Sequence, residues 1–191
     1  MTEHVPRTLE YLAHFRDKLE ARSGYKKYLQ GAPYYSMYNV GPYTFAPYKV
    51  VWKEQSSEFQ CAVISVGKLE KEYKTIIPDH KLMLVPLSNE KEAHFVAACL
   101  NSSMTRLIVK GYVIDTSQST HILENVAIPQ FDSSNPIHQE LSLLSRYCHQ
   151  KAAVGIDITD LEEQVDELAA GMWGLTPEEL QDVKASLEEL R

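Results

Sequence analysis

The stretch Asn89-Glu-Lys-Glu-Ala-His-Phe-Val-Ala-Ala-Cys-Leu-Asn-Ser-Ser103 carries the strongest structural signal in the 191-residue chain. Asn89 is a favoured helix N-cap, and Glu92 supplies an acidic third helical position. Apolar residues then recur at helical spacing: Ala93, Val96, Ala97 and Leu100. Asn101-Ser-Ser103 predicts an interruption of this helix, and these residues can cap a second short helix. We therefore expect a helix pair in the centre of the chain.

Strand-like runs lie on both sides of this helix pair. Residues 48–52, 59–66, 81–87 and 121–129 are rich in β-formers and bounded by polar or turn residues. An amphipathic helix from Pro6 to a stop at Gly24 precedes them. Further helices are predicted from Pro136, over 159–170, and after a capping signature at 176–179. This order predicts an α+β fold with a small mixed β-sheet, an N-terminal helix, the central helix pair and C-terminal helices.

The negative charge is confined to the end of the chain. The sequence has 19 Lys plus Arg and 26 Asp plus Glu, and residues 151–191 hold only 3 of the basic but 11 of the acidic ones. We expect a single domain over 1–150 and an acidic helical extension over 151–191 packed on it. The net charge of −7 therefore does not exclude an anionic partner for the body.

Several protein classes lack support in the sequence. No apolar run is long enough to span a bilayer, and the N-terminus lacks the apolar core of a signal peptide. Cys61, Cys99 and Cys148 match neither a disulfide framework nor a zinc pattern. Glycine-rich nucleotide motifs, a nucleophile elbow and the Asn/Asp-Pro-Pro-aromatic loop of amino-methylating enzymes are missing. We expect no catalytic residue, cofactor or metal in this chain, no membrane contact, and a cytoplasmic location.

A basic, tyrosine-rich segment is the first candidate for binding. Residues 16–53 hold seven basic and two acidic residues, together with seven of the 11 tyrosines. Lysine neutralises phosphates, while tyrosine hydrogen-bonds them and packs on sugars or bases. The same composition is also typical of a half-buried sheet, and Trp52 fits either a core or a base-stacking position.

The polar run from Lys110 to His121 is the second candidate. It places Gln118 among small hydroxyl residues. Glutamine suits the edge of adenine, and hydroxyls suit phosphates. An ordinary solvated loop explains this composition equally well.

Five parts of the chain, in this order, resemble one family. They are Leu9–Leu12 with Leu19–Arg22, Tyr43–Trp52, Glu92–Ser102, His121–Pro129 and Val165–Leu180. Together they resemble the C-terminal target-recognition, or specificity, domain of TaqI-like restriction-modification DNA adenine methyltransferases. The Ile-Pro ending of the fourth stretch, followed by a helix, is also similar to type I restriction specificity subunits.

This resemblance implies a sequence-specific DNA recognition module that directs a methyltransferase or restriction enzyme to its site. The implied partners are double-stranded DNA and a methyltransferase domain or subunit, which would bind S-adenosylmethionine. Because the sequence lacks that domain, we expect a fragment, a truncated gene product or a separately encoded subunit. The residues expected to face DNA are Arg22, Lys26, Lys27, Tyr34, Tyr35, Tyr43, Lys49, Lys53, Lys110, Ser117, Gln118 and Ser119.

A protein-docking role is the alternative. The predicted C-terminal helices share an apolar face made by Leu161, Val165, Leu168, Met172 and Trp173. Such a face can dock another domain. It can equally pack on its own domain, which is the usual fate of an amphipathic helix.

Overall fold

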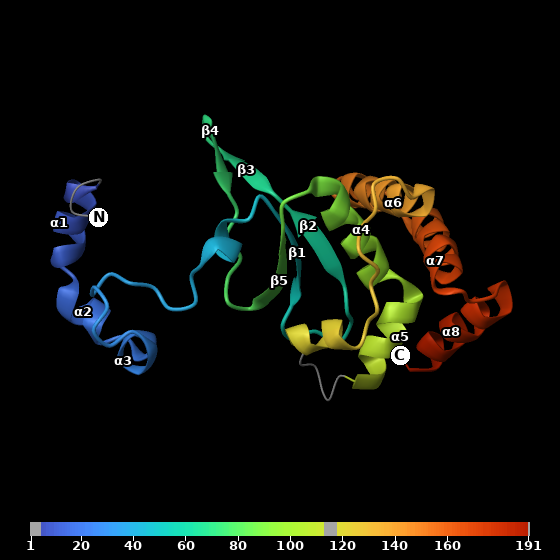
Figure 1. Cartoon of the computed structure of the whole chain (residues 1–191), viewed down its shortest axis with the longest axis horizontal. Coiled ribbons are helices and arrows are strands. Elements are labelled where there is room, and N and C mark those ends of the chain that lie inside the picture. The colour runs from blue at the N-terminus through green and yellow to red at the C-terminus, as the bar shows by residue number, and fades with distance from the viewer. Residues whose placement is uncertain (1–4, 113–117, 191) are drawn as a thin grey trace. The chain divides into compact units, whose positions relative to one another are not determined.

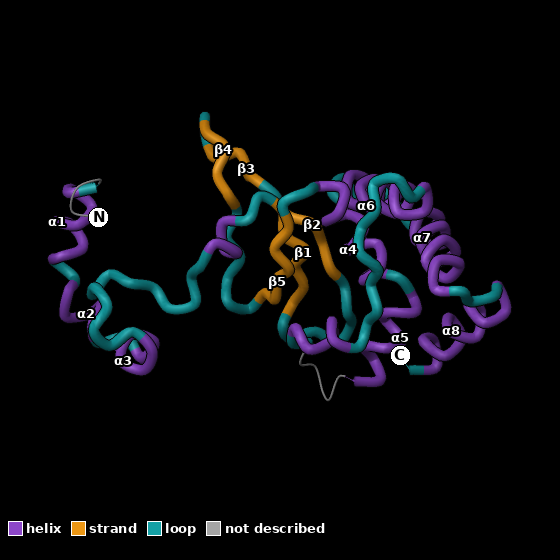
Figure 2. Tube along the Cα trace, in the orientation of Figure 1, coloured by secondary structure: helices purple, strands orange, loops and turns teal. Residues whose placement is uncertain are grey.

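The computed structural model describes residues 5–112 and 118–190 and confirms the α+β class (Figures 1 and 2). The chain forms two compact units, one ending at Thr44 and the other beginning at Phe45. The sequence-based boundary at residue 150 does not coincide with a division, because residues on both sides of it share one hydrophobic core. Among the described helices, none has the length and apolarity needed to cross a membrane.

Three short helices form in the N-terminal unit: α1 (Pro6–Ala13), α2 (Arg16–Glu20) and α3 (Ser23–Tyr28). The prediction of one helix ending at Gly24 is wrong. The backbone leaves helical geometry at Phe15 (φ −112°, ψ 11°), and Gly24 lies inside α3. None of the three helices buries a residue. Because helices gain most of their stability by packing an apolar face, nothing here holds one long helix together.

The second unit contains a three-stranded sheet in the order β2-β1-β5. Its strands are β1 (Tyr48–Lys53), β2 (Cys61–Ile64) and β5 (Leu82–Leu87), close to three of the predicted runs. Every described pairing is antiparallel, so the expectation of a mixed sheet is wrong. The segment between β1 and β2 is too short for the crossover that a parallel pair needs.

A separate two-stranded hairpin lies between β2 and β5 along the chain. It consists of β3 (Val66–Leu69) and β4 (Glu72–Thr75), which pair only with each other. Figure 1 shows the hairpin extending away from the three-stranded sheet. The sequence patterns did not predict it as a hairpin.

Side chains from two helices close the outer edge of β2. The Asn101 carboxamide accepts from the Cys61 N–H and donates to the Cys61 carbonyl, both at 2.9 Å. His149 Nε2 accepts from the Val63 N–H at 2.8 Å, so its proton is on Nδ1, which donates to the Ser145 carbonyl at 2.7 Å. An open strand edge invites pairing with other chains. Here the two side chains take the place of a fourth strand.

The central helix pair forms as predicted, as α4 (Glu90–Asn101) and α5 (Ser103–Tyr112). Asn89 caps α4 by accepting from the Lys91 N–H at 2.9 Å. The break falls at Ser102, whose hydroxyl donates at 2.8 Å to a carbonyl in the last turn of α4. The capping residue of the first helix and the interruption were therefore both predictable from the sequence.

Three longer helices follow: α6 (Pro136–Ala152), α7 (Thr159–Trp173) and α8 (Pro177–Glu189). Asn135 caps α6, and Thr176 with Glu179 forms the predicted capping box of α8. Between the helix pair and α6, the predicted strand at 121–129 is wrong. That segment begins with a 3₁₀ turn, η2 (Thr120–Glu124), and a short apolar run alone does not distinguish a strand from another buried segment.

Helix α4 lies between the sheet and helix α6 (Figure 1), and it contributes to two separate clusters of the core. On one side, Ala97 and Leu100 pack against Val50 and Trp52 of the sheet. On the other, Phe95 packs among residues of α6, α7 and α8. The apolar face considered for docking belongs to this second cluster. It consists of Leu161, Val165, Leu168, Met172 and Trp173. The acidic helices are therefore part of the packed body.

Candidate functional site

The predicted DNA-facing residues fall into two groups. One group lies in the N-terminal unit: Arg22, Lys26, Lys27, Tyr34, Tyr35 and Tyr43. The other lies in the second unit: Lys49, Lys53, Lys110, Gln118 and Ser119. Ser117 lies outside the described residues. The two groups are thus separate sets of side chains.

Arg22 connects parts of the N-terminal unit. Its Nη2 donates to the carbonyls of Tyr34 at 3.1 Å and Ser36 at 2.8 Å. The Tyr34 hydroxyl donates to the carbonyl of Leu9 in α1 at 3.3 Å, and the Tyr34 and Tyr35 rings meet edge to face. These contacts give the three side chains a structural role, and their contact with DNA stays a prediction.

Lys26 and Lys27 are exposed cations on α3. Lys27 Nζ lies 4.9 Å from the centre of the Tyr28 ring, which stacks on Tyr38 at a centroid distance of 4.2 Å. Tyr43 is also exposed, and its hydroxyl donates to the carbonyl four residues earlier. An ammonium group beside stacked rings, with a second exposed lysine on the same helix, can contact phosphates together with sugars or bases.

Lys49 is a structural residue, so its prediction as a phosphate contact is wrong. Its side chain is 1% exposed, and Nζ donates to the carbonyls of Ala46 at 2.7 Å and Ile76 at 3.1 Å. Burial lowers the pKa of this ammonium. Lys53, at the other end of β1, is exposed and remains a candidate.

Gln118 is also structural, and its prediction as a base reader is wrong. It is 2% exposed, and its Nε2 donates to the Ser56 carbonyl at 2.9 Å. The backbone carbonyl of Gln118 accepts from the buried Trp52 Nε1–H at 2.9 Å, which assigns the tryptophan to the core. Ser119 caps η2 by accepting from the His121 N–H at 3.4 Å. The polar run thus fixes a loop against the sheet.

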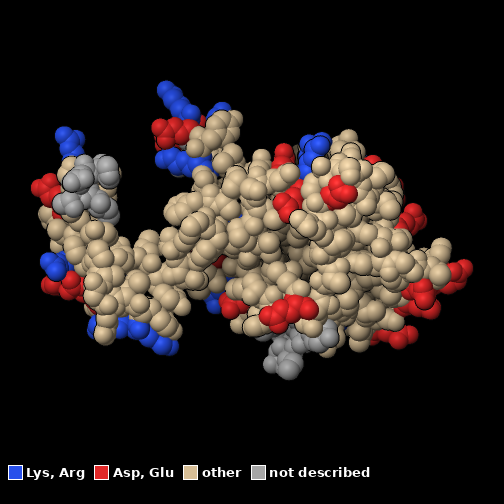
Figure 3. Space-filling model, viewed as in Figure 1, with Lys and Arg blue, Asp and Glu red and all other residues tan. Residues whose placement is uncertain are grey.

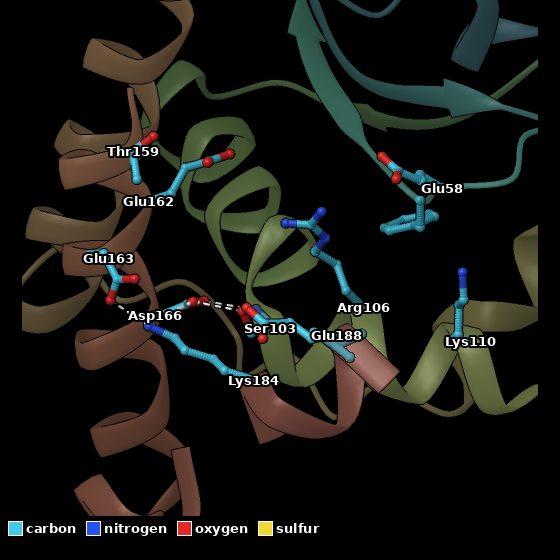
Figure 4. A pocket seen from close by; sticks show the side chains of 12 residues that line it. Glu58, Ser103, Arg106, Lys110, Thr159, Glu162, Glu163, Asp166, Lys184 and Glu188 are labelled. Carbon is cyan, nitrogen blue, oxygen red and sulfur yellow. Dashed lines mark hydrogen bonds and ion pairs between the residues drawn. The ribbon is translucent and has the colours of Figure 1, made fainter. Parts of the chain in front are cut away.

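Lys110 lies at the rim of a charged pocket of about 190 Å³ between α5, α7 and α8 (Figure 4). Arg106 and Lys184 are the other cations, facing five carboxylates of the lining: Glu58, Glu162, Glu163, Asp166 and Glu188. This excess of negative charge makes the pocket unsuited to a phosphate. Lys110 is therefore a weaker DNA candidate than its sequence position indicates.

Asp166 links the helices around this pocket. Its two carboxylate oxygens accept from the Ser103 N–H at 2.7 Å and the Ser103 hydroxyl at 2.6 Å (Figure 4). The carboxylate thus caps α5 across the fold and complements the positive end of that helix. Burial acts to lower the pKa of Lys184, but its contacts with Glu163 and Asp166 raise it overall. Four of the pocket's polar residues, Ser103, Glu163, Asp166 and Lys184, are therefore engaged in structural contacts.

A second, more apolar pocket of about 370 Å³ contains the only half-buried thiol, that of Cys148, among the described residues. Burial raises the pKa of this thiol, and the neighbouring His149 uses both ring nitrogens in the bonds at the β2 edge. His149 is therefore not free to activate the sulfur. In the described part of the chain, no group of three His, Cys, Asp or Glu residues is arranged to hold a metal ion.

The β3–β4 hairpin carries exposed candidate side chains that the sequence analysis did not single out. Lys68, Lys71, Tyr73 and Lys74 are all exposed, and Tyr73 reaches 72%. Figure 3 shows basic side chains over the hairpin with acidic ones among them, whereas acidic side chains gather over the C-terminal helices. The signal available in the sequence was the regular spacing of three lysines around an exposed tyrosine.

No protein-family model and no curated protein matches this chain. The resemblance to a TaqI-like specificity domain stays a prediction.

Proposed function

We propose that this protein is a sequence-specific DNA recognition module of a restriction-modification system, directing a methyltransferase or restriction enzyme to its target site. The observation that carries the proposal is the separation of charge within the second unit. On the β3–β4 hairpin three exposed lysines outnumber two exposed glutamates, whereas acidic residues predominate on α7 and α8. A duplex attracts the first surface and repels the second, which defines how the unit faces DNA.

The N-terminal unit adds a second cationic surface. Lys26 and Lys27 are exposed on α3, and Lys27 lies over the Tyr28 ring of the Tyr28–Tyr38 stack. Lysines neutralise phosphates without regard to sequence, while tyrosine rings pack on sugars. These two lysines would therefore supply affinity rather than base discrimination.

The catalytic step belongs to the partner in this proposal. The partner is a methyltransferase domain or subunit that binds S-adenosylmethionine and carries the chemistry. The role of this chain is to position that partner on a DNA site. Because the cationic surfaces are small and the whole chain has a net charge of −7, we expect weak binding by the chain alone.

Titration of the full chain into fluorescent duplex DNA at two salt concentrations tests the proposal. We expect dissociation constants of about 1–100 μM at low salt, weakening steeply as salt rises, because phosphate contacts release counterions. Lys26→Gln with Lys27→Gln should reduce the salt slope by up to about 2. The control pair Lys91→Gln and Lys151→Gln changes charge equally at exposed sites on α4 and α6. Absent or salt-independent binding by the unmodified chain would contradict the proposal.

The protein-docking alternative receives less support. The apolar face that favoured it is packed inside the second unit, with Val165 buried and Trp173 Nε1 donating to the Ala127 carbonyl at 2.9 Å. A partner could use that face only by displacing these internal contacts. The methyltransferase partner would therefore have to bind elsewhere on the chain.

A further inference from the structure

We propose that the β3–β4 hairpin is the element that enters the major groove of the DNA duplex. This inference rests on the proposed function, since it assigns a binding element to a DNA recognition module. The occupant of the hairpin surface is double-stranded DNA, identified by its charge and by the dimensions of its groove.

The hairpin has the size that a major groove admits. Each strand has four residues, from Val66 to Leu69 and from Glu72 to Thr75, joined by a two-residue turn. At about 3.4 Å per residue, the ribbon extends about 10–14 Å. The major groove is about 12 Å wide and about 8.5 Å deep and accepts a two-stranded ribbon. The turn would reach the floor of the groove while the base of the hairpin stays outside.

The lysines are distributed around the ribbon. In the antiparallel register, Lys68 is paired with Tyr73 on one face, while Lys74 is paired with Gly67 on the other. Lys71 lies in the turn. A ribbon in the groove has a phosphate backbone along each side, and this arrangement presents an ammonium group from either face.

Two carboxylates accompany these lysines. Glu72 pairs with Lys74 at 3.5 Å, and Glu70 lies in the turn with φ 54°. Facing phosphates, the carboxylates would oppose binding, but at the groove floor a carboxylate accepts hydrogen bonds from the cytosine amino group. Their position on a groove-entering ribbon therefore agrees with base contact better than with flat contact to a phosphate backbone.

The base of the hairpin is fixed to the body. Lys49 Nζ bonds the Ile76 carbonyl directly after β4. The Ile76 side chain lies against Gly67, where an added Cβ would come within 3.1 Å of it. These contacts hold both strands at the root of the hairpin, so less conformational freedom is lost on binding.

The hairpin exposes two large apolar side chains to solvent. Tyr73 is the most exposed large hydrophobic residue described, and Val66 shares its face of the ribbon. Thymine methyl groups and sugar edges offer apolar contacts in the major groove. Tyr73 therefore fits a ring that is covered only when DNA is bound.

The experiment compares the unmodified full chain with the triple variant Lys68→Gln, Lys71→Gln and Lys74→Gln. All three lysines are exposed, so the thermal unfolding midpoint should not change. Duplex affinity should fall about 10- to 100-fold, and the salt slope should lose up to about 3. The matched control is Lys81→Gln, Lys91→Gln and Lys151→Gln, three exposed lysines outside the hairpin, for which we expect a smaller loss of affinity.

Chemical protection identifies the groove. Dimethyl sulfate methylates guanine N7 in the major groove and adenine N3 in the minor groove. We expect the unmodified chain to protect guanine N7 and the hairpin variant to lose that protection. Protection of adenine N3 alone, or equal binding to single strands, would overturn the groove assignment.

The outcomes separate the two proposals. If the unmodified chain does not bind duplex DNA, the proposed function fails. If it binds and the hairpin variant binds with the same affinity and salt slope, the hairpin inference fails while the proposed function stands. Tyr73→Ala keeps the charge, so a loss of affinity without a change in salt slope would support contact by the ring.

Discussion

The interactions that stabilise the N-terminal unit differ from those that stabilise the second unit. Helices α1, α2 and α3 bury no residue, and their surroundings are connected by Arg22, tyrosine hydroxyls and ring pairs. Helix α4 instead buries residues on two sides, between the sheet and the C-terminal helices. A net hydrogen bond contributes about 0.5–1.5 kcal/mol, whereas a fully buried large side chain contributes about 1.5–3 kcal/mol. The stability of the protein is therefore concentrated in the second unit.

The two units also differ in the exposure of their aromatic side chains. In the first unit, aromatic side chains such as Tyr11, Tyr28 and Tyr38 remain exposed. In the second, Trp52 and Phe95 are buried. A segment with few buried apolar contacts is expected to open locally at low free energy. The same scarcity of burial leaves its lysines and rings accessible to a partner.

Truncating the core of the second unit should have the largest effect. Phe95 is fully buried and packs against Phe131 and His138. Phe95→Ala should lower the free energy of unfolding by about 3–5 kcal/mol, because it removes burial and leaves a cavity. Denaturant unfolding followed by tryptophan fluorescence measures this. A loss below about 1 kcal/mol would show that the core does not carry the stability.

Removing the cross-fold cap should have the next largest effect. Asp166→Ala leaves the Ser103 N–H and hydroxyl without their acceptor and takes a buried partner from Lys184. We expect a loss of about 2–4 kcal/mol, since hydrogen bonds to charged groups are the stronger ones. Asp166→Asn keeps one acceptor and should lose less. Equal stability of the two variants would contradict the capping role of the carboxylate.

Acid should destabilise the second unit through His94. Burial, together with the nearby His149 and Arg146, lowers the pKa of His94 from 6.5 to about 4. The unfolded chain therefore binds the proton first as pH falls. The free energy of unfolding should be constant above about pH 7.5 and fall by about 3 kcal/mol between pH 6.5 and 4.

Unfolding curves at a series of pH values test this dependence. His94→Asn serves as the control, because it removes the titrating group. The variant should be less stable at pH 7.5 and should lose less stability down to pH 4. An unchanged slope would assign the acid sensitivity to another group.

The smallest effect is expected in the N-terminal unit. Tyr28 is 51% exposed and stacks on Tyr38. Tyr28→Ala should change the global free energy of unfolding by less than about 1 kcal/mol, because little area returns to water. It should instead raise the rate of amide hydrogen exchange in α3. A global loss as large as that of Phe95→Ala would erase the difference between the two units.

The helices of the second unit were predictable from local patterns. Asn89 and Thr176 cap helices as the sequence predicts, and α6 begins at the predicted Pro136, because a helix start depends on residues within about three positions. Strands β1 and β5 were predictable from short apolar runs bounded by polar or turn residues. The segment at 121–129 was not, because a buried apolar run looks the same whether or not it pairs as a strand.

The candidate site was less predictable. Lysines at 26, 49 and 68 are chemically identical in the sequence, yet Lys49 donates to two internal carbonyls while Lys26 and Lys68 face solvent. Gln118 likewise donates to a backbone carbonyl 62 residues away. Composition finds a basic segment, but it does not say which ammonium groups are free.

The sequence alone determined the helix pair, the helix caps and the concentration of acidic residues near the C-terminus, because these depend on neighbours along the chain. Only the tertiary structure decided that Asp166 caps α5, that Asn101 and His149 close the β2 edge, and that the hairpin lysines are exposed. Each of these facts depends on groups far apart in sequence, whose burial and partners are set by packing.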